Sequence, residues 1–369
     1  MLRDLDAGFL NPSSQHRPGQ LARRQLEQYR TKIIDHLGGE SRGMATDRLV
    51  FTSGGTESDN LAIFGLASWG RQRLVEQNLI SKTASCQVLF SAVEHPAVAE
   101  TRNRLAQLGF RVREIPVDEN GIIRLDELKQ RLLEPTALVS IMLANNETGV
   151  LQPVQEAAEL CRQQSVLVHS DAVQVAGKLP LRFRELGLDA LSVTAHKVGG
   201  PRGIGGLLLR SGISPEPMLF GGFQQLGTRP GTEDVLLAGG LATALESWSS
   251  SGRAADLEKL RDWLQGELLA RFPNSFVHGA AVERTPQTLN ISFPWIDRQS
   301  FLMAADLAGL AVSAGSACAS GSSEPSPVLL AMGVEKSLVN SAIRFSLGHT
   351  NTVDEISETL ARLESILRR

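Results

Sequence analysis

The stretch FTSGGTESDNLAI, residues 51 to 63, joins an apolar run to a helix-like run through a short glycine turn. The apolar residues favour a buried strand, and Thr56 followed by Glu57 is typical of the first turn of a helix. Because a helix N-terminus presents free backbone N–H groups, Gly55 and Thr56 are candidate ligands of a phosphate group. A plain turn capped by Thr56 explains the same residues equally well. The nucleotide fingerprints G-x-G-x-x-G and G-x-x-x-x-G-K-[ST] do not occur in the chain, so a nucleotide is the poorer interpretation.

The same rhythm of strand and helix continues on the C-terminal side of this stretch. Short apolar or β-branched runs alternate with amphipathic stretches from about residue 48 to 210, and the runs are RLVFTSGG, CQVLFSAVEH, FRVREIPV, ALVSIMLANN, SVLVHSDAV, ALSVTAHK and GGLLLR. This alternation predicts an α/β domain with a mostly parallel sheet covered on both faces. Ligands of such sheets bind beyond the carboxyl ends of the strands, where this sequence places its polar residues.

The chain length of 369 residues favours two domains. Long helical stretches lead out of the first domain, and the runs TLNISFP and AIRFSLG with helices around them predict a smaller α+β domain. We therefore expect a large ligand-binding domain over residues 1–240 and a small C-terminal domain over residues 241–369.

Composition and charge narrow the class of protein. Hydrophobic residues make up 42% and charged residues 21% of the chain, which is typical of a folded soluble protein. The net charge of -3 and the lack of a basic block argue against direct binding of nucleic acid or of an anionic membrane. No signal core and no membrane-length apolar run occurs, so the sequence predicts a cytoplasmic protein. Three cysteines without C-x-x-C spacing predict neither a disulfide framework nor a metal site.

The segment SVTAHKVGGPRGIGGLLLR, residues 192 to 210, places Lys197 after a strand and before a glycine-rich turn. A lysine at a strand end is most often a surface residue. Here Thr194, His196 and Lys197 bring three hydrogen-bonding side chains together, and the glycines allow a planar ligand to approach the backbone. A partly buried lysine has a lowered pKa and suits a Schiff base with an aldehyde cofactor.

Two further strand ends carry candidate ligands of such a cofactor. Asp171 ends the run VLVHSD, Gln174 lies three residues later, and His95 follows CQVLFSAVE. A carboxylate on a pyridine nitrogen keeps the ring protonated, which is the partner expected in pyridoxal phosphate enzymes. Gln174 would then donate to the phenolic oxygen, and His95 would stack on the ring. The alternative interpretations are a loop cap for Asp171 and a solvent-facing side chain for His95.

The segment SAGSACASGSSEPSP, residues 313 to 327, surrounds Cys318 with small residues. A free cysteine is usually a small buried hydrophobe, but this segment offers little apolar area with which to bury one. Cys318 is therefore predicted to be a reactive thiol. Cys86 and Cys161 lie in a strand-like and a helix-like run and are predicted to belong to the core.

Eight motifs in order resemble the cysteine desulfurases of the NifS/IscS type, which are class V, fold-type I pyridoxal phosphate enzymes. The motifs are SGGTESDNLAI, VEHPAV, LANNETG, DAVQVAGK, TAHKVGGPRGIGG, RPGTED, SAGSACASGSSEPS and IRFSLG. The resemblance extends from about Asn11 to the C-terminus. It implies a homodimer with a seven-stranded, mostly parallel sheet in the large domain and a small α+β domain that carries the cysteine loop. The family's opening strand and its LDxxATTP-like loop have no counterpart, so we expect a shortened N-terminus.

The resemblance also implies a role for each matching residue. Lys197 would hold pyridoxal 5'-phosphate as a Schiff base, His95 would stack on the ring, Asp171 would bind the ring nitrogen and Gln174 the phenolic oxygen. The residues implied to bind the phosphate are Gly55, Thr56, Thr194 and His196, with Thr232 reaching in from the partner subunit. Asn146 would contact substrate and cofactor, and Arg344 would pair with the substrate carboxylate.

The implied reaction converts L-cysteine to L-alanine and leaves the sulfur as a persulfide on Cys318. That sulfur would pass to a protein acceptor such as an iron–sulfur scaffold, or serve thio-cofactor or transfer RNA modification. Three alternatives fit the sequence as well: a selenocysteine lyase, a class V aminotransferase, which has no need of Cys318, and a truncated, non-catalytic sulfur carrier or assembly partner.

Overall fold

The protein is described by a computed structural model that covers residue 8 and residues 10–249, 252–315 and 324–368. The chain divides into two compact units. The first comprises Met1–Ile115, Leu125–Leu143 and Pro153–Ser250, and the second comprises Pro116–Arg124, Ala144–Gln152 and Ser251–Arg369. The boundary expected after residue 240 lies inside a helix of the first unit, and two earlier segments of the chain belong to the second unit.

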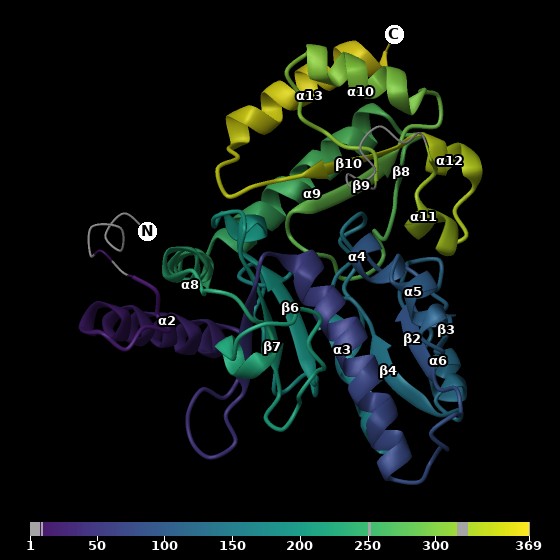
Figure 1. Ribbon diagram of the computed structural model, residues 1–369. Helices are drawn as coiled ribbons and strands as arrows, with labels where there is room; N and C mark the ends of the chain where they lie inside the picture. The colour runs from purple at the N-terminus through teal and green to yellow at the C-terminus, as the bar shows by residue number, and fades with distance from the viewer. Residues whose placement is uncertain (1–7, 9, 250–251, 316–323, 369) are drawn as a thin grey trace. The chain divides into compact units, whose positions relative to one another are not determined.

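The first unit is built on a seven-stranded sheet among the described residues, as the sequence predicted (Figure 1). Its strands are β1 (Arg48–Thr52), β2 (Gln87–Ser91), β3 (Arg111–Ile115), β4 (Thr136–Ser140), β5 (Leu167–Asp171), β6 (Ala190–Thr194) and β7 (Gly205–Leu209). They lie in the order β1-β7-β6-β5-β4-β2-β3. β7 runs antiparallel to both neighbours, while the pairs from β6 to β3 are parallel. The carboxyl ends of the other six strands therefore lie at one edge of the sheet, beside the start of β7.

Helices cover this sheet. They are α2 (Arg17–His36), α3 (Gly55–Glu76), α4 (Pro96–Ala99), α5 (Arg102–Gln107), α6 (Leu125–Arg131), α7 (Val154–Gln163) and α8 (Val235–Ser249), with the 3-10 turns η1 (Ala195–Val198) and η2 (Gln224–Gly227). α3 packs across β4 to β7, and α2 lies beside α8 (Figure 1). Leu61, Ile63 and Leu66 of α3 are buried against the apolar strands, which explains why this helix lacks a clear polar face.

The second unit has a core of its own. Its strands β8 (Phe276–Val277), β9 (Thr288–Ser292) and β10 (Ala342–Ser346) pair antiparallel in the order β10-β9-β8. Its helices are α9 (Arg253–Arg271), α10 (Arg298–Leu307), α11 (Pro327–Ala331), α12 (Lys336–Asn340) and α13 (Val353–Leu367). Phe272, Phe293 and Phe301 fill the space between strands and helices. Thr352 and Glu355 form a capping box that begins α13. This is the α+β unit expected from the sequence.

Two cysteines are buried as predicted. Cys86 precedes β2 and Cys161 lies in α7, and neither thiol is exposed to solvent. Burial raises the pKa of both thiols, so neither is a good nucleophile near neutral pH.

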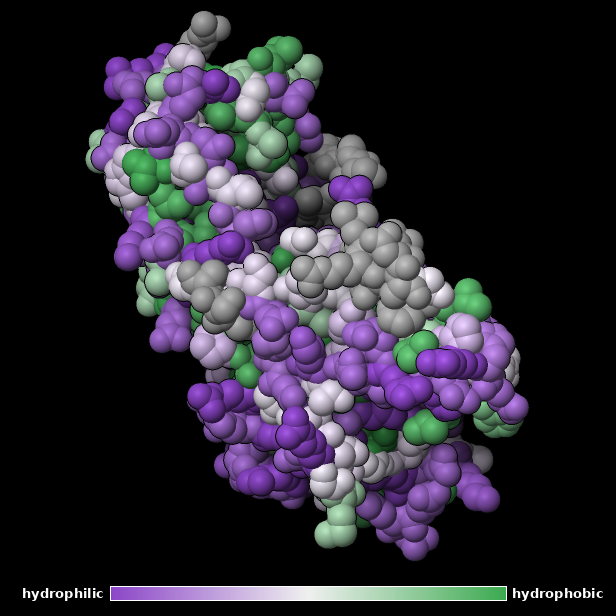
Figure 2. Space-filling model, turned by 90° about the vertical axis from the view of Figure 1, so that its left-hand side faces the viewer, coloured by the Kyte–Doolittle hydropathy of each residue, from purple (hydrophilic) through white to green (hydrophobic). Residues whose placement is uncertain are grey.

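The surface agrees with the ordinary composition of the chain. On the face seen in Figure 2, hydrophilic side chains predominate and hydrophobic ones form small separate groups. Within the part of the chain that the structure describes, no helix is long and apolar enough to cross a membrane.

Candidate active site

Most of the residues predicted for a cofactor site gather at the carboxyl edge of the large sheet. Lys197 lies in η1 directly after β6, and Asp171 is the last residue of β5. His95 follows β2 as the N-cap of α4, and Gly55 follows β1 as the first residue of α3. The parallel strands bring these four side chains or backbone groups to one edge although they are far apart in sequence.

The turn before α3 packs closely against its neighbours. A Cβ atom added to Gly55 would lie 3.0 Å from Cγ2 of Val173, so a larger residue at this position would crowd the turn. The hydroxyl of Thr194 donates to the carbonyl oxygen of Ile204 at 3.2 Å, and its oxygen lies 3.1 Å from Nδ1 of His196. The free N–H groups at the start of α3 and the Thr194 hydroxyl thus form a polar cradle.

Positive charge is concentrated beside this cradle. Burial lowers the pKa of His196, and three neighbouring cations lower it further, namely Lys197, Arg202 and Lys178. Lys178 itself is buried, and burial together with the charge of Lys197 lowers its pKa to about 7. The cations favour an anionic ligand at this end of the edge.

The opposite charge lies at the end of β5. Asp171 is 5% exposed, and its Oδ1 accepts the backbone N–H of Val173 at 2.8 Å. Burial raises the pKa of Asp171 to about 6, although that N–H group and the charge of Lys197 favour the carboxylate. Nδ1 of His95 accepts the N–H of Ala97 at 3.1 Å, which fixes the ring and leaves Nε2 as the protonated nitrogen. The edge therefore suits a ligand with an anionic group at one end and a basic nitrogen at the other.

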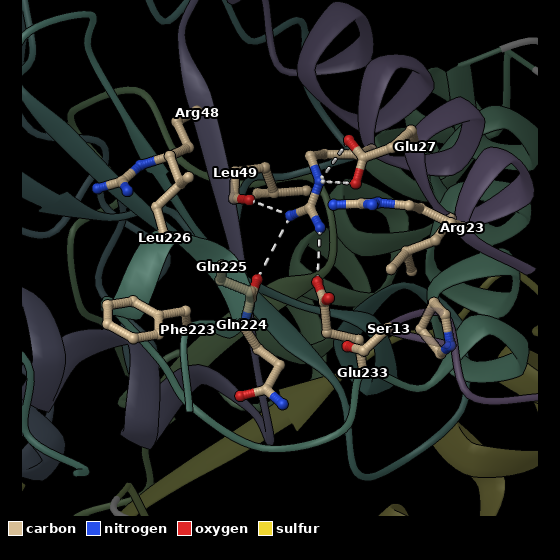
Figure 3. Close-up of a pocket in the computed structure, with 13 residues that line it drawn as sticks. Ser13, Arg23, Glu27, Arg48, Leu49, Phe223, Gln224, Gln225, Leu226 and Glu233 are labelled. Carbon is tan, nitrogen blue, oxygen red and sulfur yellow. Dashed lines mark hydrogen bonds and ion pairs between the residues drawn. The ribbon is translucent and has the colours of Figure 1, made fainter. Parts of the chain in front are cut away.

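Thr232 lies in an exposed loop that is tied to the edge of the sheet. The side-chain amide of Gln225 pairs with β1, because its Oε1 accepts the Phe51 N–H at 2.6 Å and its Nε2 donates to the Phe51 carbonyl at 2.8 Å. Arg30 of α2 pairs with Glu233 at 2.7 Å, directly after Thr232 (Figure 3). These contacts surround a pocket of about 520 Å³ and hold the loop in place. That Thr232 reaches a partner subunit stays a prediction.

In the second unit the structure brings together the two residues predicted to contact substrate. Nη1 of Arg344 in β10 donates to the carbonyl oxygens of Asn146 at 3.0 Å and of Gly315 at 2.9 Å. Backbone carbonyl groups from two separate segments therefore fix this end of the guanidinium. Cys318, the predicted nucleophile, lies outside the described residues.

Comparison with known proteins agrees with this geometry. The family model for aminotransferase class V matches residues 6–359. The cysteine desulfurase IscS of Dictyoglomus turgidum is 39% identical over 98% of this chain and 88% of the relative. The chain belongs to the cysteine desulfurase branch of the class-V aminotransferase family.

Solved structures of the family have the same fold. A NifS-like protein from Rickettsia africae covers 97% of this chain and 92% of its own, with 31% identity and a TM-score of 0.83. A structure described as SspA in complex with cysteine covers 93% of this chain and 92% of its own, with 29% identity and a TM-score of 0.77. The recognised family and the fold-type I architecture are thereby confirmed, and the family is one of pyridoxal phosphate enzymes.

Sequence reasoning missed a buried carboxyl group in the second unit. Glu147 is 2% exposed, and its Oε2 accepts the hydroxyl of Ser326 at 2.6 Å. A Cβ on Gly315 would lie 2.3 Å from the same oxygen. Burial raises the pKa of Glu147, while the Ser326 hydrogen bond and the charges of Arg344 and Arg298 oppose the rise. Glu147 thus contacts the chain on both sides of residues 316–323.

We expect Glu147→Ala to lower the free energy of unfolding by about 1–3 kcal/mol, because it leaves the buried Ser326 hydroxyl without its acceptor. Glu147→Gln keeps an oxygen that accepts this hydrogen bond. Its free energy of unfolding should therefore fall by less than half as much as that of Glu147→Ala. Urea unfolding followed by fluorescence measures the free energy of unfolding of both variants. Equal losses in the two variants would show that the charge of Glu147, and not its hydrogen bond, stabilises this region.

A second set of missed residues lies in the first unit, beneath the carboxyl edge. Asp59, Glu94 and His169 are polar residues at most 6% exposed, each inside or next to an apolar run. The signal was present in the sequence, since the strand LVHSD interrupts an apolar run with a histidine two residues before Asp171. A polar side chain within a buried strand requires partners, and these are described below.

Proposed function

We propose that the protein is a cysteine desulfurase that uses pyridoxal 5'-phosphate to move the sulfur of L-cysteine to Cys318. The observation that carries the proposal is the arrangement at the carboxyl edge, where Lys197 follows β6, Asp171 ends β5 and cations surround His196. A phosphate fits the cationic end, a pyridine nitrogen fits Asp171, and an aldehyde requires a lysine amine between them.

The residues proposed to hold the cofactor each supply one contact. Gly55 and Thr56 offer backbone N–H groups to the phosphate, assisted by the side chains of Thr194 and His196. Asp171 accepts a hydrogen bond from the protonated ring nitrogen, and Gln174 donates to the phenolic oxygen. His95 stacks on the ring, in the orientation that its bond to the Ala97 N–H fixes. The bound cofactor supplies an aldehyde that condenses with amines and a ring that takes up electrons from the substrate.

In this proposal Arg344 and Asn146 bind the substrate. Arg344 pairs with the carboxylate of cysteine, since a planar guanidinium matches two carboxylate oxygens, and Asn146 contacts substrate and cofactor. Hydrogen bonds to the carbonyl oxygens of Asn146 and Gly315 orient the guanidinium before substrate binds, which supports this role. The Lys197 amine removes the proton from the α-carbon and returns a proton later in the reaction.

Cys318 takes the sulfur. Its thiolate forms an S–S bond with the substrate sulfur while the bond from that sulfur to the β-carbon breaks. The carbon skeleton gains protons and leaves as alanine, so one thiol and one cysteine give one persulfide and one alanine. We propose a protein acceptor for the persulfide, such as an iron–sulfur scaffold.

A homodimer is part of the proposal. Phe220, Phe223 and Leu226, in the loop that leads to Thr232, are each at least 80% exposed. Large apolar side chains at such exposure mark a protein interaction surface, which supports contact of this loop with a second subunit. A cytoplasmic location remains a prediction from composition.

The test uses purified protein with added pyridoxal phosphate and L-cysteine. We expect a visible absorbance band that borohydride removes, and equal amounts of alanine and persulfide or sulfide. A protein without the band would be a carrier or assembly partner, as the non-catalytic alternative predicts. Turnover of selenocysteine but not cysteine would favour the lyase, and amino transfer to a keto acid without sulfur release would favour the aminotransferase.

A further inference from the structure

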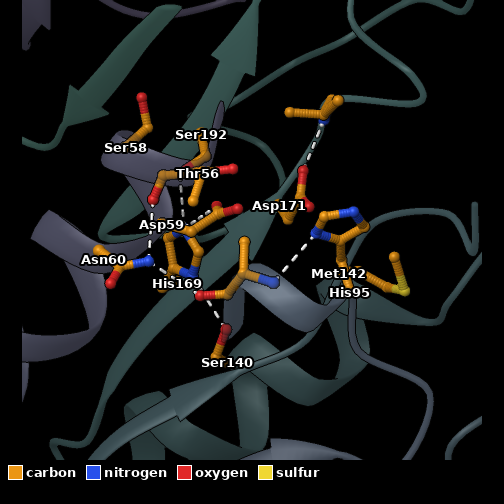
Figure 4. A network of polar contacts seen from close by, with 12 residues as sticks. Thr56, Ser58, Asp59, Asn60, His95, Ser140, Met142, His169, Asp171 and Ser192 are labelled. Carbon is orange, nitrogen blue, oxygen red and sulfur yellow. Dashed lines mark hydrogen bonds and ion pairs between the residues drawn. The ribbon is translucent and has the colours of Figure 1, made fainter. Parts of the chain in front are cut away.

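A chain of buried polar side chains lies beneath the carboxyl edge and links four elements of the first unit (Figure 4). Nδ1 of His169 in β5 lies 2.9 Å from the hydroxyl of Ser140 in β4, and Nε2 lies 2.9 Å from the hydroxyl of Ser192 in β6. The same Nε2 is 3.7 Å from Oδ1 of Asp59 in α3. None of the four residues is more than 1% exposed. These side chains therefore connect three adjacent strands to the helix that covers them.

These buried polar side chains lie close to Asp171 in the sheet. His169 and Asp171 are two residues apart in β5, so their side chains point to the same face of the sheet. Ser192 pairs with Asp171 across β5 and β6. Asp59 is close enough to Asp171 for the two carboxyl groups to repel each other when both are charged. A change at His169 or Asp59 would consequently alter the surroundings of the carboxylate at the end of β5.

Three buried carboxyl groups compete for negative charge here, and the structure favours one of them. Asp171 has the N–H of Val173 and the nearby charge of Lys197 to stabilise its anion. Burial raises the pKa of Asp59 and of Glu94 well above the usual range, and the charge of Asp171 adds to both shifts. Since two buried like charges cannot both be stabilised, Asp171 carries the charge and the other two stay protonated.

The neighbouring histidine does not supply a compensating charge. Burial lowers the pKa of His169 to about 3, so its ring is neutral at physiological pH. A neutral imidazole has one donor and one acceptor nitrogen, which the two serine hydroxyls match. The groups facing Asp59 are thus neutral His169, protonated Glu94 and ionised Asp171, with Lys197 beyond Asp171.

We propose that Asp59, which lies beside His169 beneath the carboxyl edge, is a positioning residue for Asp171, which the proposed function assigns to the ring nitrogen of the cofactor. His169 ties β4, β5 and β6 together through Ser140 and Ser192, and the uncharged Asp59 keeps a second negative charge away from Asp171. Asp171 then keeps both its place and its full charge.

The holoenzyme test compares two variants of Asp59. Asp59→Asn keeps the shape and polar contacts of the protonated acid, so kcat and the pH titration of the cofactor absorbance should match the wild type. Asp59→Leu keeps the branched side-chain skeleton, with bulkier methyl groups in place of the oxygens, but makes no hydrogen bond. It should lower kcat by roughly tenfold to a hundredfold, shift the absorbance titration and leave KM for cysteine unchanged. An Asn variant as impaired as the Leu variant, or a Leu variant equal to the wild type, would overturn the proposal.

A second measurement needs no cofactor. A carboxyl group whose pKa is higher in the folded than in the unfolded state destabilises the fold progressively as pH rises above the unfolded-state value. The urea midpoint of Asp59→Asn should therefore rise relative to that of the wild type as pH increases from about 4 to 8. A midpoint difference that moves the other way would mean that Asp59 is a stabilised anion, and the proposal fails. Because the full chain without cofactor is used, this result is separate from the failure of pyridoxal phosphate to bind.

Discussion

Lys197→Ala should abolish both the visible absorbance band of the cofactor and the turnover of cysteine. We expect a loss of activity of about 10³-fold or more, since the variant removes the amine that bonds the aldehyde and also the base that moves the α-proton. The position of Lys197 directly after β6, at the edge where Asp171 and the start of α3 also lie, is the reason for assigning it both tasks.

Two control variants test whether the nucleophilic amine of Lys197, and not only its positive charge, is required. Lys197→Arg keeps a cation beside the phosphate cradle but has no nucleophilic amine, so it should lose the borohydride-sensitive band as completely as the alanine variant. Lys259→Ala changes a lysine whose side chain is 79% exposed, and it should retain the band and the rate. Absorbance spectra before and after borohydride treatment report the Schiff base in all three variants, and alanine release reports their turnover. A band retained by Lys197→Ala would place the Schiff base on another lysine.

The large sheet was predictable because most of its strands are short apolar runs, and the exception, β3, has β-branched residues among its charged ones. All seven runs named from the sequence are strands in the structure, including β7, whose glycines pack against β1 and β6. The candidate site at their carboxyl ends was predictable for the same reason, because the topology of a parallel sheet dictates where the ends meet.

The local sequence pattern predicted the division into two units less well than it predicted the large sheet. Residues 116–124 and 144–152 belong to the second unit, although they lie within the stretch of alternating strands and helices. Their placement depends on contacts with residues distant in sequence, such as Glu147 with Ser326 and Leu151 with Glu283. Periodicity reports which side of a residue is buried but not which distant segment buries it.

The buried polar residues escaped prediction for a related reason. His169 and Asp59 lie inside or next to apolar runs, and the His169 partners Ser140 and Ser192 are ordinary strand residues until the strands pair. Sequence alone gives the cost of burying such groups but not the partners that offset it. Where a histidine interrupts a buried strand next to a candidate catalytic carboxylate, a hydrogen-bonded network is the better expectation.

Cys318→Ser is the variant that tests sulfur transfer alone. It should reduce persulfide and sulfide formation from cysteine by about 10³-fold or more, because a serine hydroxyl cannot form the S–S bond that carries the sulfur. The cofactor absorbance band should be unchanged, since the residues proposed to hold the cofactor are intact. Cys161→Ala is the matched control, because burial raises the pKa of that thiol and makes it unreactive. Undiminished sulfide release by Cys318→Ser, or its loss in Cys161→Ala with the fold intact, would assign the nucleophile to a different residue.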